Sequence, residues 1–304
     1  MPDRKHLFRR GRTISPAATP KRPPPPAAAP VEPIIEFRGV SLVHRSGALG
    51  LERATFAIAR SELAFLTGPA GAGKSTVMRL LTKELEASGG SVWVAGRDLS
   101  RIARSGLARY RRNLGLVRHD SVLMADRSVQ EQIVDALRVT GATRDERAGW
   151  ASDVLRLTGL SNRADGLPEQ LTPGEHRRVC IARAFASRPP LLLADEPARG
   201  LDHETSIGIM RLLYRINLTG TTVLVATRDR ALVAKLRRHV IELDRGDVVG
   251  DTAAGLQAED ESTREFAARV RGASADSELD AAEERAASAV RLARALHRDR
   301  GQPG

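Results

Sequence analysis

Nine residues from Gly68 to Thr76 have the types and the spacing of a loop that binds phosphate groups. They match the pattern G-x-x-x-x-G-K-[ST], between a run typical of a strand and a run typical of a helix. Glycines let the backbone direct its N–H groups at a polyphosphate, and the start of the helix adds partial positive charge. Lys74 can reach the β- and γ-phosphates of a nucleotide, and Ser75 can bind Mg²⁺. The predicted nucleotide-binding residues of this loop are Gly68, Pro69, Ala70, Gly71, Ala72, Gly73, Lys74, Ser75 and Thr76.

Two carboxylates, Asp195 and Glu196, form a second candidate group. They follow the apolar run 191–194, which is typical of a buried strand, and they precede Pro197. In a parallel sheet both would lie at the carboxyl ends of the strands, where nucleotides bind. Asp195 can then bind Mg²⁺ with Ser75, and Glu196 can orient the attacking water or accept its proton. An acidic pair at a strand end is usually solvated or a helix cap, but the upstream phosphate loop favours a hydrolytic site.

The helices and strands that must position these groups are expected to form an α/β fold with a mixed sheet. Three short strands are expected beside the strand that leads into the phosphate loop, and they indicate a small antiparallel region. These strands are 34–37, 55–58 and 92–94, next to 63–66. Helices and strands alternate after residue 173, which indicates a largely parallel sheet with helices on its faces. The expected elements are helices 174–186, 204–217 and 229–236 and strands 191–194, 222–226 and 240–243.

Composition divides the chain into three parts. Residues 1–32 are basic and rich in proline, which predicts a disordered tail. Residues 33–255 carry the nucleotide-binding motifs, with a helical subdomain at about 101–175 that includes a helix expected at 144–158. Residues 256–304 are charged and alanine-rich with apolar residues at helical spacing. They predict a partly helical extension, either a docking helix or a charged helix without a fixed role.

The overall composition limits the classes of protein that fit. The chain has 304 residues, a net charge of +11 and 41% hydrophobic residues, enough for a sizeable core. Cys180 is the only cysteine, which excludes an intramolecular disulfide and fits a reducing compartment. No apolar run approaches the roughly 20 residues of a membrane helix. The charge suits nucleic acid or an anionic membrane, or follows from an arginine-rich composition alone. Because only 3% of the residues are aromatic, no specific nucleic acid is expected.

Two further motifs complete an ordered set. Leu171-Thr172-Pro173-Gly174-Glu175 precedes a run typical of a helix, and Gly200-Leu201-Asp202 follows the acidic pair. Together with the phosphate loop and the carboxylates, these motifs resemble those of the ATP-binding-cassette (ABC) family over about residues 33–250. The resemblance implies the fold of a P-loop ABC nucleotide-binding domain. It also implies ATP and Mg²⁺ as ligands, and hydrolysis of ATP to ADP and phosphate.

Within that family the chain resembles the cell-division branch, FtsE, in the stretches 64–76, 123–129 and 192–197. This resemblance implies a head-to-tail homodimer in which Thr172 and Gly174 of one copy face the phosphate loop of the other. It implies an FtsX-like integral membrane partner and a peripheral position on the cytoplasmic face of the cell membrane. Two alternatives stay open: the ATP-binding subunit of a lipoprotein- or macrolide-export transporter, and a nucleotide-dependent scaffold with little hydrolysis.

Four positions depart from the family pattern. His44 stands where an aromatic side chain stacks on adenine, and His119 stands where a glutamine contacts Mg²⁺ and the attacking water. Pro173 replaces a signature glycine and removes one backbone N–H. Arg228 replaces the switch histidine and cannot accept a hydrogen bond. The predicted catalytic residues are Glu196, His119 and Arg228, and we expect Mg-ATP binding with weak or partner-dependent hydrolysis.

Overall fold

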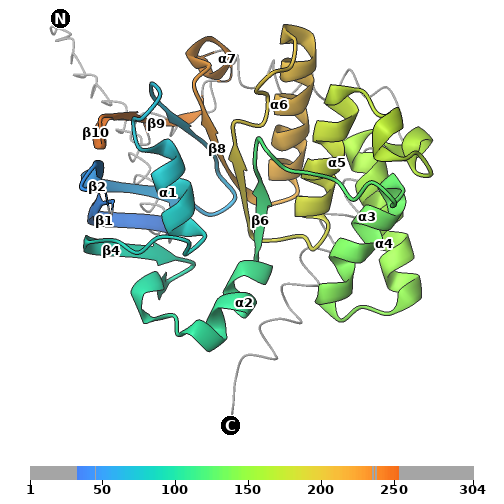
Figure 1. The fold of residues 1–304 in the computed structure, drawn as a ribbon, viewed down its shortest axis with the longest axis horizontal. Helices are drawn as coiled ribbons and strands as arrows, with labels where there is room; N and C mark the ends of the chain where they lie inside the picture. The colour runs from blue at the N-terminus through green and yellow to red at the C-terminus, as the bar shows by residue number, and fades with distance from the viewer. Residues whose placement is uncertain (1–32, 45, 235, 237, 253–304) are drawn as a thin grey trace, which may run out of the picture. The chain divides into compact units, whose positions relative to one another are not determined.

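The computed structural model describes residues 33–44, 46–234, 236 and 238–252 (Figure 1). The predicted disordered tail, 1–32, and the predicted helical extension, 256–304, lie outside these residues. Among the helices of the described part, none is both long and apolar enough to cross a membrane.

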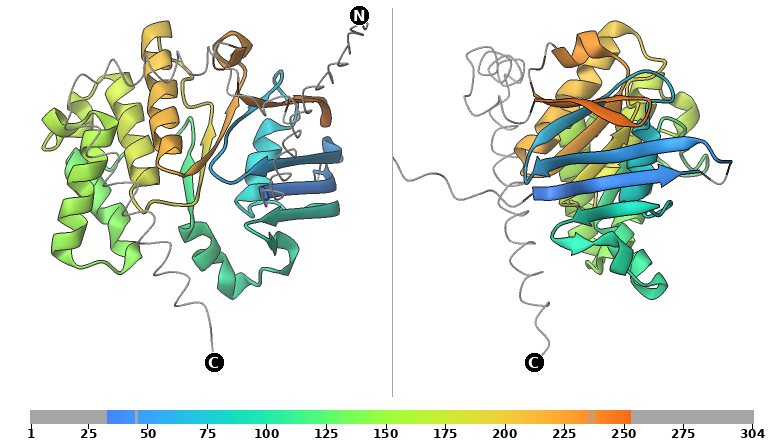
Figure 2. Two further views of the ribbon diagram at one scale, coloured as in Figure 1. Left: turned by 180° about the vertical axis from the view of Figure 1, so that it is seen from behind. Right: turned by 90° about the vertical axis from the view of Figure 1, so that its left-hand side faces the viewer.

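A four-stranded antiparallel sheet, in the order β2-β1-β4-β5, forms one layer of the described chain (Figure 2, right). Apolar and polar side chains alternate along its strands, so one face is buried and the other meets solvent. This sheet is the predicted antiparallel region, and its first two strands extend well beyond the apolar cores that predicted them. Its strands are β1 (Pro33–Val43), β2 (Leu49–Ala59), β4 (Gly89–Val94) and β5 (Arg97–Asp98).

A six-stranded sheet, in the order β10-β9-β3-β8-β7-β6, is the centre of the fold. Five neighbouring strands run parallel, and only β10 pairs antiparallel, with β9. The mixed sheet predicted from the alternation of helices and strands is confirmed. Its strands are β3 (Leu63–Thr67), β6 (Leu114–Val117), β7 (Leu191–Asp195), β8 (Thr222–Thr227), β9 (His239–Asp244) and β10 (Asp247–Asp251).

The central strands of the large sheet are buried on both faces. In β3, Leu63 and Phe65 pack with the helical layer, whereas Ala64 and Leu66 pack with α1 and the antiparallel sheet. Continuous apolar runs are expected for parallel strands covered on both sides. The carboxyl ends of β3, β8 and β7 open on one edge of the sheet, and the phosphate loop and the carboxylate pair both emerge from that edge.

Helices cover the large sheet, and α3, α4 and α5 pack together as a helical layer (Figure 1). The helices are α1 (Lys74–Leu81), α2 (Arg104–Arg112), α3 (Val129–Leu137), α4 (Arg144–Thr158), α5 (Pro173–Phe185), α6 (His203–Leu218) and α7 (Arg230–Ala234). Short 3₁₀ turns occur at Leu99–Arg101, Arg138–Thr140, Ser161–Arg163 and Pro168–Gln170. The predicted helix 144–158 coincides with α4, and the Thr143 hydroxyl caps it by accepting from the N–H of Glu146.

The helical subdomain predicted at about 101–175 contains one strand of the large sheet. Residues 114–117 form β6, paired in parallel with β7, and α2 lies beside β6 apart from the helical layer (Figures 1 and 2). The sequence does not reveal this strand, because four apolar residues are too few to show a period. Gly115 fits the strand to its neighbours, since a Cβ there would lie 2.6 Å from the carbonyl oxygen of Ala184. The helical layer itself begins at Val129.

Candidate nucleotide-binding site

The phosphate loop leaves β3, enters α1 and lies directly on two other strands. Gly68 has φ 144°, and a Cβ there would lie 2.2 Å from the carbonyl oxygen of Leu243 in β9. Gly73 has φ 107°, and its Cβ would lie 2.8 Å from the carbonyl oxygen of Gly50 in β2. Only glycine combines these dihedral angles with such close backbone approach. The loop conformation is therefore fixed by packing against β2 and β9.

Lys74 lies within the fold of this loop and is only 6% exposed. Its Nζ donates to the carbonyl oxygens of Gly68, at 2.6 Å, and Pro69, at 2.8 Å. Burial lowers the pKa of Lys74, while the nearby Glu196 and Asp195 oppose that shift. The ammonium group is desolvated and bound by neutral oxygens. An anionic phosphate would be a stronger partner for it than either carbonyl.

Asp195 ends β7 and faces the first turn of α1. Burial raises the pKa of Asp195, and the opposing effects come from His119, Arg118 and Lys74 and from a hydrogen bond with Ser75. The Asp195 carboxylate and the Ser75 hydroxyl thus meet at one point. Carboxylate and hydroxyl oxygens are the hard donors that suit Mg²⁺.

Glu196 follows Asp195 in a constrained backbone conformation, with φ 47°. Its N–H donates to the carbonyl oxygen of Ala226, at 2.9 Å, which turns the chain out of the sheet. Its Oε1 is buried without a hydrogen-bond partner and lies 3.2 Å from Nε of Arg228, an ion-pair contact. A buried acceptor without a hydrogen bond is costly, so this oxygen is available to a donor such as a water molecule. Strained backbone at such a position is typical of functional sites.

One cleft of about 260 Å³ brings the two predicted groups together. It joins the end of β7 to the loop, and it also receives His44, His119 and Arg228 from three other parts of the chain. Of the loop residues predicted to bind nucleotide, Gly68, Pro69 and Ala70 do not line the cleft. The lining residues are His44, Leu49, Gly50, Gly71, Ala72, Gly73, Lys74, Ser75, Thr76, His119, Asp195, Glu196, Arg199 and Arg228.

The loop that carries His119 is held in place by α5. Arg177 donates from Nη1 to the carbonyl oxygen of Arg118, at 2.9 Å, and from Nη2 to that of His119, at 3.1 Å. Arg183, almost two turns further along α5, donates to the carbonyl oxygen of Val122 at 2.9 Å. The backbone of 118–122 is thereby tied to the helix that follows the signature motif.

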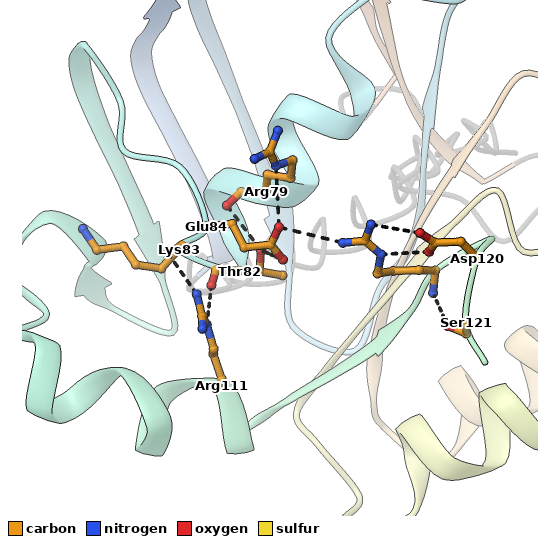
Figure 3. Close-up of polar contacts among 8 residues, drawn as sticks. Arg79, Thr82, Lys83, Glu84, Arg111, Asp120 and Ser121 are labelled. Carbon is orange, nitrogen blue, oxygen red and sulfur yellow. Dashed lines mark hydrogen bonds and ion pairs between the residues drawn. The ribbon is translucent and has the colours of Figure 1, made fainter. Parts of the chain in front are cut away.

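The same loop is also connected to the end of α1 by ion pairs. The guanidinium of Arg118 pairs with Asp120, at 2.9 Å, and lies 3.8 Å from Glu84. Glu84 in turn lies 3.5 Å from Nε of Arg79 (Figure 3). These groups are partly exposed, so each pair contributes little to stability alone. Together they connect the His119 loop to the helix that begins at the phosphate loop.

The signature residues Thr172 and Gly174 do not line the cleft. They start α5, where Thr172 and Glu175 form a capping box in which the Thr172 hydroxyl accepts from the N–H of Glu175, with Pro173 in the first turn. A Cβ on Gly174 would lie 2.7 Å from Cγ2 of Thr205 in the first turn of α6, so the two helix starts lie side by side. Asp202 caps α6 by accepting from the N–H of Thr205 at 2.9 Å. The motifs at 172–174 and 200–202 therefore form one surface.

Sequence reasoning missed two arginines near the cleft. Arg199 lines it, and its position three residues after Glu196 was a usable signal, because the chain has not yet left that edge of the sheet. Arg177 holds the His119 loop across a separation of 58 residues. No sequence signal could have shown that contact.

Comparison with known proteins places these features in a family. The model of the family described as ABC transporter matches residues 51–199. The chain is 39% identical over 222 residues to the cell division ATP-binding protein FtsE of Streptococcus pneumoniae D39, covering 73% of this chain and 96% of that protein. It is 42% identical to FtsE of Mycobacterium tuberculosis over 203 residues, 67% of this chain and 88% of that protein. FtsE of Escherichia coli K12 is 37% identical, over 71% of this chain and 98% of that protein.

Solved structures with a similar fold are also ATP-binding cassettes. One is a dimeric post-hydrolysis state of a cassette bound to ADP and Pi, with a TM-score of 0.64 and 28% identity, covering 71% of this chain and 97% of that one. Another is part of the cbiONQ ABC transporter complex of Clostridium perfringens, with a TM-score of 0.68 and 25% identity, covering 79% of this chain and 92% of that one.

Proposed function

Because the chain belongs to the ABC-type ATPases, and within them to the FtsE family, we propose that it is the ATP-binding subunit of a membrane complex acting in cell division. The observation that carries the proposal is the cleft that joins Lys74 and Ser75 to Asp195 and Glu196. These groups supply a phosphate ligand, a metal site and a base for water within one cavity. The partner is an FtsX-like integral membrane protein, and the chain acts at the cytoplasmic face of the membrane.

The residues at the end of β7 fit a bound Mg²⁺. The Ser75 hydroxyl and the Asp195 carboxylate line the same cleft, and both offer the oxygen donors that this ion prefers. When bound, Mg²⁺ would neutralise charge on the β- and γ-phosphates. Lys74 would bind the same phosphates with its ammonium group. Glu196 would hold the attacking water through Oε1, which has no hydrogen bond and an ion-pair contact with Arg228, and would accept a proton from it.

The cleft is open toward a second subunit in this proposal. Thr172 and Gly174 lie outside the cleft of their own chain, at the joined starts of α5 and α6. In a head-to-tail homodimer they would contact the nucleotide of the other copy from the N-terminal end of α5. Helix N-termini favour anions, but Pro173 leaves one N–H fewer for that contact.

A second candidate function, a nucleotide-dependent scaffold with little hydrolysis, is favoured by one specific contact. Nε of Arg228 lies 3.2 Å from Oε1 of Glu196, the oxygen that would hold the water. The guanidinium occupies one side of that oxygen, so an attacking water would have to share it with Arg228. Arginine also cannot accept a hydrogen bond, as a neutral histidine can. Slow turnover is thus expected from the same geometry.

The two functions are separated by Glu196→Gln, which keeps the side-chain shape and removes the base. We expect the variant to bind ATP with unchanged affinity and to lose at least about 100-fold in steady-state turnover. If division is restored in a depleted strain by wild type and not by the variant, turnover is required and the ATPase proposal stands. If the variant restores division, the scaffold function is correct.

Affinity capture from detergent-solubilised membranes tests the partner. Recovery of an FtsX-like membrane protein supports the cell-division assignment. Recovery of a lipoprotein- or macrolide-export permease in its place would contradict it.

A further inference from the structure

A surface rich in arginine covers α2 and the turn that precedes it. It comprises Arg97, Arg101, Arg104, Arg109 and Arg112, all exposed, and is called the arginine surface below. No Asp or Glu occurs between residues 99 and 119. Of the carboxylates near it, Asp98 has a side chain only 12% exposed, accepts from the N–H and the hydroxyl of Ser100, and lies 3.6 Å from Nε of Arg101, which it partly neutralises. Glu86, in the connection between α1 and β4, is near Arg104 and pairs with Lys83. The surface keeps a clear excess of positive charge.

Helix α2 presents these arginines outward because its other face is fixed to the body. The Tyr110 hydroxyl donates to the carbonyl oxygen of Leu81, at 2.5 Å. Arg111 donates to the carbonyl oxygens of Thr82, at 3.0 Å, and Lys83, at 3.2 Å (Figure 3). Arg111 therefore binds the backbone that follows α1 and is not part of the arginine surface.

The remaining arginines of α2 lie on the side of the helix that faces away from Tyr110. At 100° per residue, Arg104, Arg109 and Arg112 fall within about 140° of the helix circumference. Only Ser105 and Ala108, both exposed, lie between them in that sector. The face is consequently rigid, cationic and free of large apolar side chains.

A hollow of about 500 Å³ adjoins this face. Three arginines and one carboxylate line it beside two aromatic side chains: Arg97, Arg101, Arg109, Asp98, Trp93 and Tyr110. The indole N–H of Trp93 donates to Ser91, at 3.0 Å, and the guanidinium of Arg38 lies 4.9 Å from the centre of its ring. Cations beside the edges of Trp and Tyr suit a ligand that combines a phosphate with an apolar body.

We propose that the arginine surface binds the anionic headgroups of a phospholipid membrane directly, in addition to any attachment through a protein partner. Guanidinium groups pair with phosphate through two parallel hydrogen bonds, and several on one rigid face bind a charged plane together. Each basic residue near an anionic bilayer raises affinity by about fivefold. A nucleic acid fits less well, because Arg38 already lies over the Trp93 ring and the arginines of α2 have no exposed aromatic side chain between them on which a base could stack.

Vesicle sedimentation of the full chain tests the proposal. The vesicles are phosphatidylcholine with one quarter phosphatidylglycerol, or phosphatidylcholine alone, at 0.1 M NaCl. The test variant replaces Arg97, Arg104, Arg109 and Arg112 with Gln. We expect wild type to bind the anionic vesicles and not the neutral ones, and the variant to lose about 600-fold in affinity, fivefold for each of the four charges.

A matched variant controls for the loss of four charges. It replaces Arg53, Arg60, Arg144 and Arg211, which are also exposed but lie outside the arginine surface, with Gln. We expect this variant to retain at least a third of the wild-type affinity for anionic vesicles. Both variants should bind a fluorescent ATP analogue as wild type does, which separates this result from a failure of the nucleotide site.

Three outcomes would overturn the proposal. The first is equal vesicle binding by the two quadruple variants, and the second is no preference of wild type for anionic over neutral vesicles. The third is a test variant that loses affinity for a single-stranded oligonucleotide while its vesicle binding is unchanged, which would assign the surface to nucleic acid.

Discussion

The two sides of the nucleotide cleft differ in how firmly the fold holds them. On the phosphate-loop side, Lys74 is 6% exposed and the loop lies against the backbone of β9 and β2. On the opposite rim the Arg228 side chain is 55% exposed, and His119 stands on an exposed loop. Of the substituted positions that line the cleft, His119 and Arg228 belong to this rim, whereas His44 lies beside Gly50 on the phosphate-loop side.

This difference has a physical reason. A substitution in the buried loop would force close-packed backbone to move. At Gly68, for example, a Cβ would lie only 2.2 Å from the carbonyl oxygen of Leu243. A change on the rim alters only a partly solvated contact, so the fold tolerates it. We infer that the phosphate-loop side sets the affinity for ATP, whereas the rim sets the rate of ATP hydrolysis.

The largest expected effect comes from the buried side. Lys74→Ala removes the ammonium group that the loop has desolvated for a phosphate, and charge-assisted bonds of this kind are strong. We expect ATP affinity to fall about 100-fold, measured by titration calorimetry. Lys83→Ala is the control, because Lys83 pairs with Glu86 at 2.8 Å and does not line the cleft. If the Lys74 variant binds ATP within threefold of the wild-type affinity, the phosphate-loop side does not set that affinity.

The second effect concerns the strand beneath the loop. His239 of β9 is buried, with Nδ1 2.9 Å from Glu62 and Nε2 2.8 Å from Asp251. Burial opposes its charge, but the two carboxylates outweigh burial and raise the pKa of His239. Because the folded pKa lies above the unfolded value of about 6.5, the contribution is complete below that pH and is lost as pH rises through the folded pKa.

His239→Gln should therefore lower the free energy of unfolding by about 2 kcal/mol at pH 6 and by less at pH 9. Urea denaturation at the two pH values measures both differences. If the difference in free energy of unfolding between wild type and variant is larger at pH 9 than at pH 6, the imidazole is neutral in the folded protein. The result measures how firmly the phosphate-loop side is held, because Leu243 of β9 packs directly against Gly68 of the loop.

The smallest effect tests how the rim is held. Arg177→Met keeps the apolar stem and removes the two hydrogen bonds to the backbone at Arg118 and His119. We expect kcat to fall about fivefold with ATP affinity unchanged, because the loop loses its position and not its side chain. Arg183→Met, which releases only Val122, should change kcat less. Weaker ATP binding in place of slower turnover would contradict the assignment of this loop to the rim.

Much of the site could be predicted from the sequence because its motifs are local. The phosphate loop, the carboxylate pair and the capping box at Thr172 are each set by fewer than ten neighbouring residues, and the structure places the first two in one cleft. The helix 144–158 was predictable because a cap and a C-terminal Gly159 bound it.

The features that escaped prediction depend on distant contacts. β6 has four residues, and its place in the sheet is decided by pairing with β7, over seventy residues later. β10 and the contacts of Arg177 likewise depend on where other elements lie. The pairing of Arg228 with Glu196 is of the same kind, since the two come from different strand ends. The sequence identified Arg228 as the replacement of the switch histidine, and the structure adds that its guanidinium lies against the Glu196 carboxylate.

The measurement that tests the account most directly is the effect of Arg228→His on turnover and on ATP affinity, determined on the same preparation. The substitution removes the fixed cation beside Glu196 and supplies a side chain that can accept a hydrogen bond. The account predicts that turnover rises about tenfold, equivalent to one well-placed hydrogen bond, while affinity stays within threefold. An affinity that changes tenfold with turnover unaltered would contradict it, because the rim would then bind ATP and not control its hydrolysis.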